Sequence, residues 1–346
     1  MARYLVGLSG GVDSALVASM LRDQGHDVVC GFMITYRDDT PRCTTRHDLE
    51  SARAVADFLG CPLHLFDYRD DYHAKIISLM VAEYRRGRTP NPDVWCNSLI
   101  KFDLFAQDAM MLGVDAIATG HYATIRDGSL YPGVDPIKDQ SYFLSRLTRD
   151  QRQFAFFPLG VMTKEEVRRR AHERGLPNAD RPDSQGLCFI GNVSIREFLR
   201  PWIESSSGPL ISRDGKRIGT HTGAWQRTRG QRRGLGLLPE WYVYETDVVS
   251  NTVYVCHKED PLLWSDTIIC EDWVWHDDPD GRSGCSLVGK VRSRMQRSPC
   301  IMDHEQKIVF STPVWGVACG QVCAIADAQT RRLIGSGIIS SVKPGG

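Results

Sequence analysis

Ser9-Gly10-Gly11-Val12-Asp13-Ser14 is the stretch that decides the fold, because a strand-like apolar run precedes it and a helix-like pattern follows it. Two adjacent glycines allow a tight turn that exposes backbone amides to a phosphate, and the serines add hydroxyl donors. The amino end of the following helix contributes the positive end of its dipole. Since no Gly-Lys-Ser/Thr follows, the loop is not a Walker A motif. We expect nucleotide binding here; a serine-capped turn without a ligand is the alternative.

Strand-like and helix-like segments alternate around this loop. The expected strands are 3–8, 27–34, 62–66 and 114–118, and the expected helices are 14–24, 48–59, 72–84 and 100–112. This alternation predicts an α/β fold with a parallel sheet flanked by helices. Ligands of such sheets bind beyond the carboxyl ends of the strands, where the segments 9–14 and 119–122 lie.

Beyond Pro201 the pattern changes to short β-like runs separated by Gly, Pro and Asp. The expected strands are 216–220, 241–246, 252–257, 267–270, 287–291, 307–310, 321–326 and 333–339. We expect a small β-rich central domain followed by a carboxy-terminal β-barrel. The predicted domains are 1–200, 201–262 and 263–346.

The composition excludes several classes of protein. The chain has 346 residues, with 42 Lys and Arg against 42 Asp and Glu. A net charge of zero means that any nucleic-acid site must be a local basic patch. No apolar run approaches the ~20 residues that span a bilayer, and the first strand begins almost at Met1, which leaves no room for a signal peptide. The 11 cysteines are odd in number and lack CxxC spacing. We therefore expect a reduced, cytoplasmic protein without a membrane partner.

Two motifs carry cysteines in settings that suggest chemistry. In 87–97, which we interpret as a rigid, proline-punctuated loop, Asp93 stands three residues before Cys96. In 183–191, Cys188 lies in a glycine-flanked loop. With 119–122, 138–144, 230–236 and 241–243, these motifs make the chain similar to the tRNA-specific 2-thiouridylases of the pyrophosphate-loop ATPase superfamily. The resemblance extends over essentially the whole chain.

The resemblance implies an ATP-dependent sulfurtransferase. Such enzymes adenylate the oxygen at position 2 of the wobble uridine in tRNA and replace it with sulfur from a cysteine persulfide, giving 2-thiouridine, AMP and pyrophosphate. The implied cofactors are ATP and Mg²⁺, and the implied partners are the tRNA and a sulfur-donor protein or relay. We expect the protein to be a monomer, with Asp13 placed to hold the Mg²⁺.

The residue roles follow from the same resemblance. Cys188 would carry the persulfide, Cys96 would resolve it with formation of a disulfide, and Asp93 would be the general acid/base. The nucleotide contacts would be Gly7, Leu8, Ser9, Gly10, Gly11, Val12, Asp13, Ser14, Met33 and Gly120. The tRNA contacts would be Asn91, Pro92, Asp93, His121, Lys138, Asp139, Gln140, Arg292, Ser293 and Gln321. Family members commonly have Arg-Tyr where this chain has Arg292-Ser293, so a possible stacking ring is missing.

The chemistry is consistent with these residues independently of the resemblance. A uracil oxygen leaves poorly until it is adenylated, and a persulfide is a suitable sulfur nucleophile. A second thiol can then cleave the persulfide, and a carboxylate can relay protons. Since the reacting carbon is inaccessible in a stacked anticodon loop, the base must be extruded.

Basic residues cluster in the β-rich half and predict phosphate contacts. The first cluster comprises Arg213, Lys216, Arg217, Arg227, Arg229, Arg232 and Arg233, and the second comprises Lys290, Arg292, Arg294 and Arg297. On a strand, Arg292 and Arg294 would point to the same side. A solvated surface is the alternative for either cluster, and we expect it for Arg168–Arg170.

Several alternatives remain for the cysteines and for the activity. We interpret Cys30, Cys61, Cys256, Cys270, Cys285, Cys300, Cys319 and Cys323 as small buried apolar residues, and Cys43 as incidental. We predict no metal site at the two motif cysteines, although two thiols and an aspartate could ligate an iron–sulfur cluster. The other functions considered are a ligase that adds nitrogen to an adenylated substrate and an RNA-binding protein without activity.

Overall fold

The computed structural model describes residues 1–36, 44–183, 194–276, 286–303 and 306–343. The chain forms two compact units. The first comprises Met1–Ile76, Pro92–Ser194 and Arg331–Leu333, and the second comprises Ile77–Asn91, Ile195–Thr330 and Ile334–Gly346. Cys43, Cys188 and Cys285 lie outside the described residues.

The first unit is built on a five-stranded parallel sheet in the order β3-β2-β1-β4-β7. Its strands are β1 (Arg3–Gly7), β2 (Asp27–Ile34), β3 (Leu63–Asp67), β4 (Ala116–Ala118) and β7 (Ala155–Phe156), with a separate hairpin of β5 (Ala123–Arg126) and β6 (Ser129–Pro132). Its helices are α1 (Val12–Asp23), α2 (Thr45–Leu59), α3 (Arg69–Tyr72), α5 (Pro92–Cys96), α6 (Phe105–Met111), α7 (Arg149–Gln153) and α8 (Lys164–Glu173). The expected α/β fold is confirmed.

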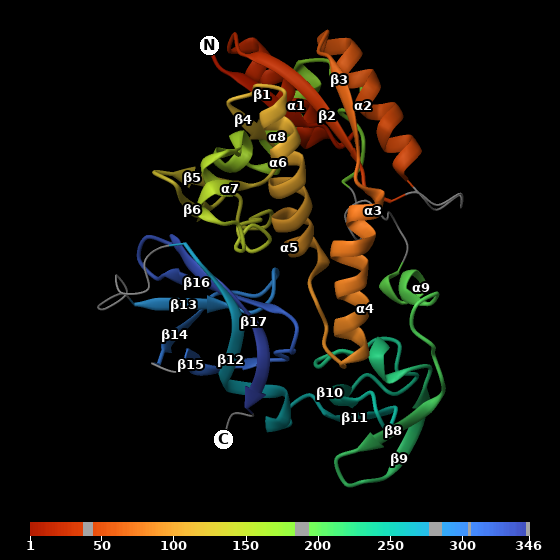
Figure 1. Ribbon diagram of the computed structural model, residues 1–346. Helices are drawn as coiled ribbons and strands as arrows, with labels where there is room; N and C mark the ends of the chain where they lie inside the picture. Colours follow the sequence, from red (N-terminus) through yellow and green to blue (C-terminus); the bar gives the residue numbers. More distant parts are fainter. Residues whose placement is uncertain (37–43, 184–193, 277–285, 304–305, 344–346) are drawn as a thin grey trace. The chain divides into compact units, whose positions relative to one another are not determined.

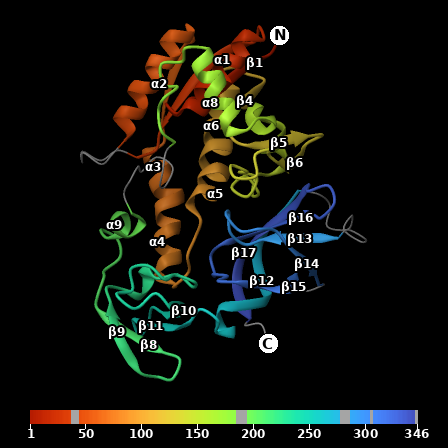
Figure 2. The ribbon, with the colours of Figure 1, turned by 180° about the vertical axis from the view of Figure 1, so that it is seen from behind.

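Helices cover both faces of this sheet (Figures 1 and 2). On one face, apolar residues of α1, α2 and α8 form a core with Val6, Val28 and Cys30 of the strands. On the other face, Phe105 of α6 packs over Gly31: a Cβ at Gly31 would lie 2.8 Å from the Phe105 ring. Successive strand residues point to opposite faces of a sheet. Cys30 therefore faces the core formed with α1, α2 and α8, and Gly31 faces α6.

The second unit contains a four-stranded sheet and a closed six-stranded barrel. The sheet has the order β10-β11-β8-β9, made of β8 (Gly208–Ser212), β9 (Arg217–His221), β10 (Trp241–Asp247) and β11 (Thr252–His257). The barrel has the order β12-β15-β14-β13-β16-β17, made of β12 (Trp264–Trp275), β13 (Leu287–Lys290), β14 (Ser298–Met302), β15 (Lys307–Trp315), β16 (Val322–Asp327) and β17 (Leu333–Lys343). The unit also holds α4 (Ser78–Arg85) and α9 (Ile195–Leu199).

The expectation of a β-rich central part followed by a barrel is confirmed, although β8 and β14 were not anticipated. Inside the barrel, Ile268, Ile308, Ile325 and Ile339 are fully buried among other apolar side chains. A smaller core of Leu210, Val243, Val253 and Val255 supports the four-stranded sheet.

The expected loop over 87–97 is wrong for its second half, because Pro92–Cys96 forms α5 and continues into a π-helical stretch, Asn97–Leu104. Proline is well suited to begin a helix, since its φ is already helical and it lacks an amide hydrogen that would go unbonded. An acidic residue in the first turn, Asp93, favours the same start. Another π-helical stretch, His73–Ile77, lies between α3 and α4.

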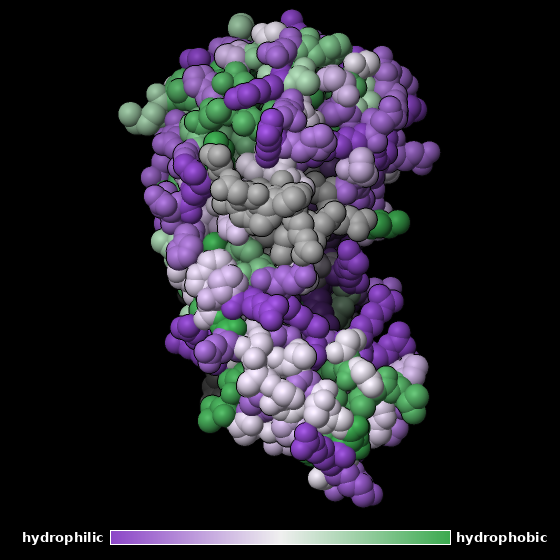
Figure 3. Space-filling view, turned by 90° about the vertical axis from the view of Figure 1, so that its right-hand side faces the viewer, coloured by the Kyte–Doolittle hydropathy of each residue, from purple (hydrophilic) through white to green (hydrophobic). Residues whose placement is uncertain are grey.

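Outside the uncertain residues, the face in Figure 3 is mainly hydrophilic or intermediate, and hydrophobic residues form only separate patches. Within the described part of the chain, no helix combines the length and apolar character needed to cross a membrane.

Candidate active site

The phosphate loop lies between the end of β1 and the start of α1. Gly10 has a φ of +81°, a conformation that favours glycine. The hydroxyls of Ser9 and Ser14 lie 3.3 Å apart, and Ser14 Oγ donates to the carbonyl of Gly11 at 3.1 Å. The loop therefore has the local geometry expected of a turn that presents backbone amides to an anion.

Three side chains hold the phosphate loop by hydrogen bonds to one atom, the carbonyl oxygen of Gly10. It accepts hydrogen bonds from Ser51 Oγ at 2.7 Å, Asn178 Nδ2 at 2.9 Å and Arg181 Nη1 at 3.1 Å. Arg181 also forms an ion pair with Asp48. Because carbonyl and amide of a trans peptide point in opposite directions, this anchor turns the Gly11 amide away from the three donors.

The sequence reasoning missed Ser51, Asn178 and Arg181, and no local motif marks them.

Asp13, the acidic residue of the loop, is held by two partners. Its Oδ1 accepts a hydrogen bond from the Tyr122 hydroxyl at 2.8 Å and lies 2.6 Å from Lys164 Nζ. Burial, followed by the charge of Asp13, raises the pKa of the Tyr122 phenol. Lys164 begins α8, which has a capping box formed by Thr163 and Glu166. The sequence reasoning missed Lys164, although the capping box could have placed it at a helix start.

Three cations converge on Asp183. Its carboxylate lies 2.6 Å from Lys138 Nζ, 2.9 Å from Lys164 Nζ and 2.5 Å from Arg168 Nη2. Burial by itself would raise the pKa of this carboxyl, but the hydrogen bonds from Lys138 and Lys164 outweigh it and hold the pKa well below its usual range. Lys164 thus links Asp13 to Asp183.

The expectation that Arg168 is a merely solvated charge is wrong, because it pairs with Asp183 and donates to the carbonyl of Arg181 at 3.1 Å. The position of Arg168 on α8 does not reveal this partner, which is 15 residues away. Arg169 on the same helix does pair with its i+4 neighbour Glu173 and is exposed.

Gly120 packs directly against the phosphate loop. A Cβ at this position would lie 2.8 Å from Asp13 Cβ and 3.0 Å from the Ser14 nitrogen, so no other residue fits without displacing the loop. Met33, at the end of β2, is buried. Both residues belong to the same compact unit as the loop.

His121 is a buried, neutral histidine. Its Nδ1 lies 2.7 Å from Thr119 Oγ1, and its ring contacts Phe102 and Phe157. Burial, with a smaller effect of Lys101, keeps its pKa well below the usual value. Gln140 exchanges two hydrogen bonds with the backbone of Tyr122, at 2.9 and 3.0 Å. Asp139 Oδ1 accepts from the Ser141 amide at 3.0 Å.

Asp93 and Cys96 lie three residues apart on α5, and therefore on the same side of the helix. The Cys96 side chain is only 2% exposed. Burial raises the pKa of its thiol to about 12, while Lys101 lowers it and Asp93 raises it by smaller amounts. The thiol is consequently protonated near neutral pH in this conformation. Cys188 cannot be compared with it, because Cys188 lies outside the described residues.

The side chains of Arg292 and Gln321 both donate hydrogen bonds to backbone carbonyls of the second unit. Arg292 Nη2 donates to the carbonyl of Arg229 at 2.8 Å and to that of Gly316. Gln321 Nε2 donates to the carbonyls of Thr89 at 2.7 Å and Pro90 at 3.3 Å. Ser293 is half-buried and follows Arg292 in a turn.

The idea that Arg292 and Arg294 point together on a strand is wrong, because β13 ends at Lys290. Both basic clusters contain buried members: Lys290 and Arg227 are less than 9% exposed. The exposed members of the first cluster are Arg213, Lys216, Arg217, Arg232 and Arg233. A count of basic residues in the sequence therefore overestimates the exposed positive charge of the two clusters, since long side chains can turn inward and bond carbonyl oxygens.

The remaining described cysteines are mostly buried, as expected. Cys30, Cys256, Cys270, Cys300 and Cys323 are buried, whereas Cys61 and Cys319 are half-buried. Within the described ranges, no group of three or more His, Cys, Asp or Glu side chains could hold a metal ion.

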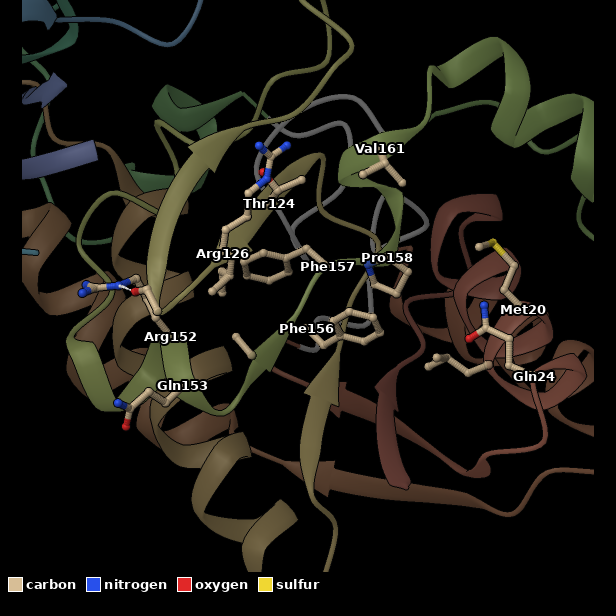
Figure 4. A pocket seen from close by; sticks show the side chains of 14 residues that line it. Met20, Gln24, Thr124, Arg126, Arg152, Gln153, Phe156, Phe157, Pro158 and Val161 are labelled. Carbon is tan, nitrogen blue, oxygen red and sulfur yellow. Dashed lines mark hydrogen bonds between the residues drawn. The ribbon is translucent and has the colours of Figure 1, made fainter. Parts of the chain in front are cut away.

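A cavity of about 620 Å³ lies elsewhere in the first unit (Figure 4). Its wall includes Met20 and Gln24, eight and twelve residues beyond the start of α1. At 1.5 Å per helical residue, these positions are roughly 12–18 Å along the helix from the phosphate loop. The buried guanidinium of Arg152 is committed to the carbonyls of Gly128 and Leu147. The cavity is therefore separate from the phosphate loop.

Three family models match consecutive parts of the chain. They describe a tRNA methyl transferase HUP domain at residues 2–192, a tRNA methyl transferase PRC-barrel domain at 196–257 and an aminomethyltransferase β-barrel domain at 265–339.

Curated relatives match at full length. The tRNA-specific 2-thiouridylase MnmA of Cupriavidus pinatubonensis is 39% identical over 360 residues, covering 99% of both chains. The protein of the same name from Nitrosomonas eutropha is 40% identical and covers 98% of both chains. That from Ralstonia pickettii is 41% identical, covering 99% of this chain and 97% of the relative.

Proposed function

Because the chain belongs to the family of tRNA-specific 2-thiouridylases, we propose that it is an ATP-dependent enzyme that replaces the oxygen at position 2 of a wobble uridine in tRNA with sulfur. The products are 2-thiouridine, AMP and pyrophosphate. The observation that carries this proposal is the anchored phosphate loop, which lies in the same compact unit as the Asp93–Cys96 helix.

The residues around the loop fit ATP and Mg²⁺. Gly120 packs against the loop at Asp13 and Ser14, and a Cβ at this position would displace both. The ammonium of Lys164, 2.6 Å from Asp13 Oδ1, shows that this carboxylate favours a positive charge at close range. Carboxylate oxygen is a ligand that Mg²⁺ prefers, so Asp13 would hold the ion. When bound, Mg²⁺ neutralises phosphate charge in the adenylation step.

The loop residues supply the rest of the phosphate contacts. The backbone amides of Gly10, Gly11 and Val12 and the hydroxyls of Ser9 and Ser14 are the proposed donors. Gly7, Leu8, Asp13, Met33 and Gly120 border the nucleotide, and the amide of Leu8 donates to the carbonyl of Gly31 instead. Lys164 adds a cation that ATP can share with Asp13 and Asp183. Since adenylation makes the uridine oxygen a good leaving group, binding of ATP prepares the base for sulfur.

The proposed sulfur transfer uses two cysteines, one that carries a persulfide and one that cleaves it. We assign the persulfide to Cys188: its terminal sulfur attacks carbon 2 of the uridine, and AMP leaves with the former oxygen. The Cys96 thiolate then attacks the sulfur of Cys188, which forms the Cys96–Cys188 disulfide and leaves the terminal sulfur on the base. In the second step the Cys96 sulfur is oxidised and the transferred sulfur is reduced, while the Cys188 sulfur keeps the oxidation level that it had in the persulfide. A reductant, a thiol or dithiol, must later restore the two thiols.

The buried state of Cys96 places a requirement on this sequence. A thiol with a pKa near 12 is a poor nucleophile at neutral pH, because almost none of it is thiolate. Its environment must therefore change when tRNA is bound, or its proton must pass to a base. Asp93, on the same side of α5, is the carboxylate we assign to proton transfer.

The proposed tRNA contacts combine the first unit with residues of the second. They are Asn91, Pro92, Asp93, His121, Lys138, Asp139, Gln140, Arg292, Ser293 and Gln321. The proposed contacts for which this structure gives an intramolecular side-chain partner are His121, Lys138, Asp139, Gln140, Arg292 and Gln321. A contact of such a side chain with tRNA requires it to exchange or share its partner.

The division into domains at 1–200, 201–262 and 263–346 stays a prediction. So do the cytoplasmic location, the monomeric state and the protein that supplies sulfur.

Mass spectrometry of nucleosides tests the function. Unmodified tRNA is incubated with the protein, ATP, Mg²⁺ and a sulfide or persulfide donor, and 2-thiouridine is expected only when all are present. Cys188→Ser should abolish 2-thiouridine while adenylation of the tRNA, monitored as tRNA-dependent release of pyrophosphate, remains measurable. Equal loss of both steps would contradict the role of Cys188, and formation of 2-thiouridine without ATP would contradict the proposed reaction.

A further inference from the structure

The chain that leads into α5 is held by the barrel. The amide of Thr89 donates to the carbonyl of Cys319 at 2.9 Å. The Gln321 side chain returns two hydrogen bonds, to the carbonyls of Thr89 at 2.7 Å and Pro90 at 3.3 Å. The hydroxyls of Thr89 and Thr228 lie 2.9 Å apart. All of these residues belong to the second compact unit.

Gly320 shows how close the approach is. Its φ is +87°, and a Cβ there would lie 3.0 Å from Arg88 Cβ and 3.0 Å from the backbone of Thr89. Arg88 is fixed in turn by Glu271 at 2.6 Å. The barrel turn 319–321 and the segment 88–90 therefore pack so closely that no side chain fits between Gly320 and the backbone of Thr89.

The next residues of the chain transmit this constraint. Pro90 and Pro92 have φ angles fixed by their rings, and each restricts the residue before it to extended conformations. The sequence Thr89-Pro90-Asn91-Pro92 consequently has few free torsions. A hold on Thr89 and Pro90 limits where α5 can begin.

We propose that Gln321 is a positioning residue that fixes the start of α5 through Thr89 and Pro90, and with it the side chains of Asp93 and Cys96. The inference rests on the proposed function only for its catalytic consequence. It gives Gln321 a positioning role, through the segment that precedes α5, in addition to the proposed contact with tRNA.

The direct test is the alkylation rate of Cys96 in the free protein, measured by mass spectrometry with iodoacetamide and without tRNA or ATP. Gln321→Ala and Gln321→Glu should each raise the rate about fivefold, the effect of one ordinary hydrogen bond on a local opening. Buried Cys323 of the barrel is the internal reference and should keep its rate. An unchanged Cys96 rate, or an equal rise at Cys323, overturns the proposal.

Gly320→Ala perturbs the same contact from the other side and should also expose Cys96. Gly215→Ala is its matched control, because Gly215 has a similar φ of +82° but a Cβ there meets no described atom within 4 Å. Gln329→Ala is the control for glutamine, since Gln329 is exposed after β16. A rise of Cys96 alkylation in either control equal to that in the test variants overturns the proposal.

Activity separates positioning from tRNA contact. We expect Gln321→Ala to lower kcat for 2-thiouridine formation about tenfold, in addition to the rise in the Kd for tRNA that loss of the proposed tRNA contact would cause. Weaker tRNA binding with an unchanged kcat and an unchanged Cys96 rate would assign Gln321 to the tRNA interface alone. If the wild-type protein forms no 2-thiouridine, the proposed function fails, but the alkylation rates still decide the role of Gln321.

Discussion

The phosphate loop and helix α5, to which we assign the chemistry of the first unit, are built in opposite ways. The loop is anchored from behind by three donors on Gly10 and presents its amides, so it is preorganised for its ligand. On α5 the thiol of Cys96 is buried, and this burial raises its pKa. Under the roles proposed above, ATP would bind to the loop as it stands, whereas sulfur transfer would require a change around the thiol.

The largest expected effect separates the two regions by substitution. Asp13→Asn should reduce tRNA-dependent AMP release about 1,000-fold, because it removes the charge that would hold Mg²⁺. Cys96→Ser should abolish 2-thiouridine but leave AMP release in a single turnover within about twofold of wild type. Both activities are measured in one assay, by nucleotide chromatography and nucleoside mass spectrometry.

Asp23→Asn, near the exposed end of the same helix α1, is the control for Asp13 and should behave as wild type. Loss of AMP release in Cys96→Ser would mean that the loop and α5 do not act in separate steps.

Lys164 tests whether the loop depends on the charge that links it to Asp183. Lys164→Ala should lower AMP release about 50-fold, as expected for the loss of a charge-assisted contact. Lys164→Arg should restore part of the activity. Arg169→Ala removes an exposed cation from the same helix and should have no effect; an equal loss in both variants would show that the total charge of α8, rather than Lys164, matters.

The pH dependence of alkylation sharpens the contrast between thiols. Cys61 has a pKa lowered to about 7, chiefly by its hydrogen bond with Cys30, so its rate should level off above pH 8. The Cys96 rate should keep rising, about tenfold per pH unit, toward its pKa of about 12. Peptide mapping after brief alkylation from pH 6 to 10 measures both.

The raised pKa of Cys96 also determines how its burial affects the stability of the fold as pH changes. The thiol of Cys96 is neutral in both folded and unfolded chains below pH 9, and above that value the unfolded chain ionises more readily. Burial of Cys96 therefore weakens the fold as pH rises from 9 toward 12.

In the alkylation experiment, a plateau of the Cys96 alkylation rate near pH 8 would contradict the buried state of this thiol.

The smallest expected effect concerns the anchor of Gly10. Asn178→Ala should raise the Kd for ATP about fivefold, since one hydrogen bond to the anchored carbonyl is lost. Binding of adenosine should be unchanged, because the anchor acts only on the phosphate side. Isothermal titration calorimetry with both ligands checks this, and an equal weakening of adenosine would point to a general disturbance of the pocket.

Short-range patterns explain why much of the fold could be predicted. The strand, the glycine turn and the helix around Ser9–Ser14 are consecutive, and their conformations depend on neighbouring residues. The same holds for the alternating strands and helices of the first unit. The error at Pro92–Cys96 arose because proline marks helix starts as well as loops.

The sequence alone therefore determined the α/β unit, the β-rich second half, the phosphate loop and the cysteine of α5 as a candidate. Only the tertiary structure decided the partners of these groups. Asn178 and Arg181 reach Gly10 across 168 and 171 positions, and Lys164 reaches Asp13 across 151. The burial that raises the pKa of Cys96 is likewise a property of the packed unit. Hydrogen bonds and burial act through space, so separation along the chain carries no record of them.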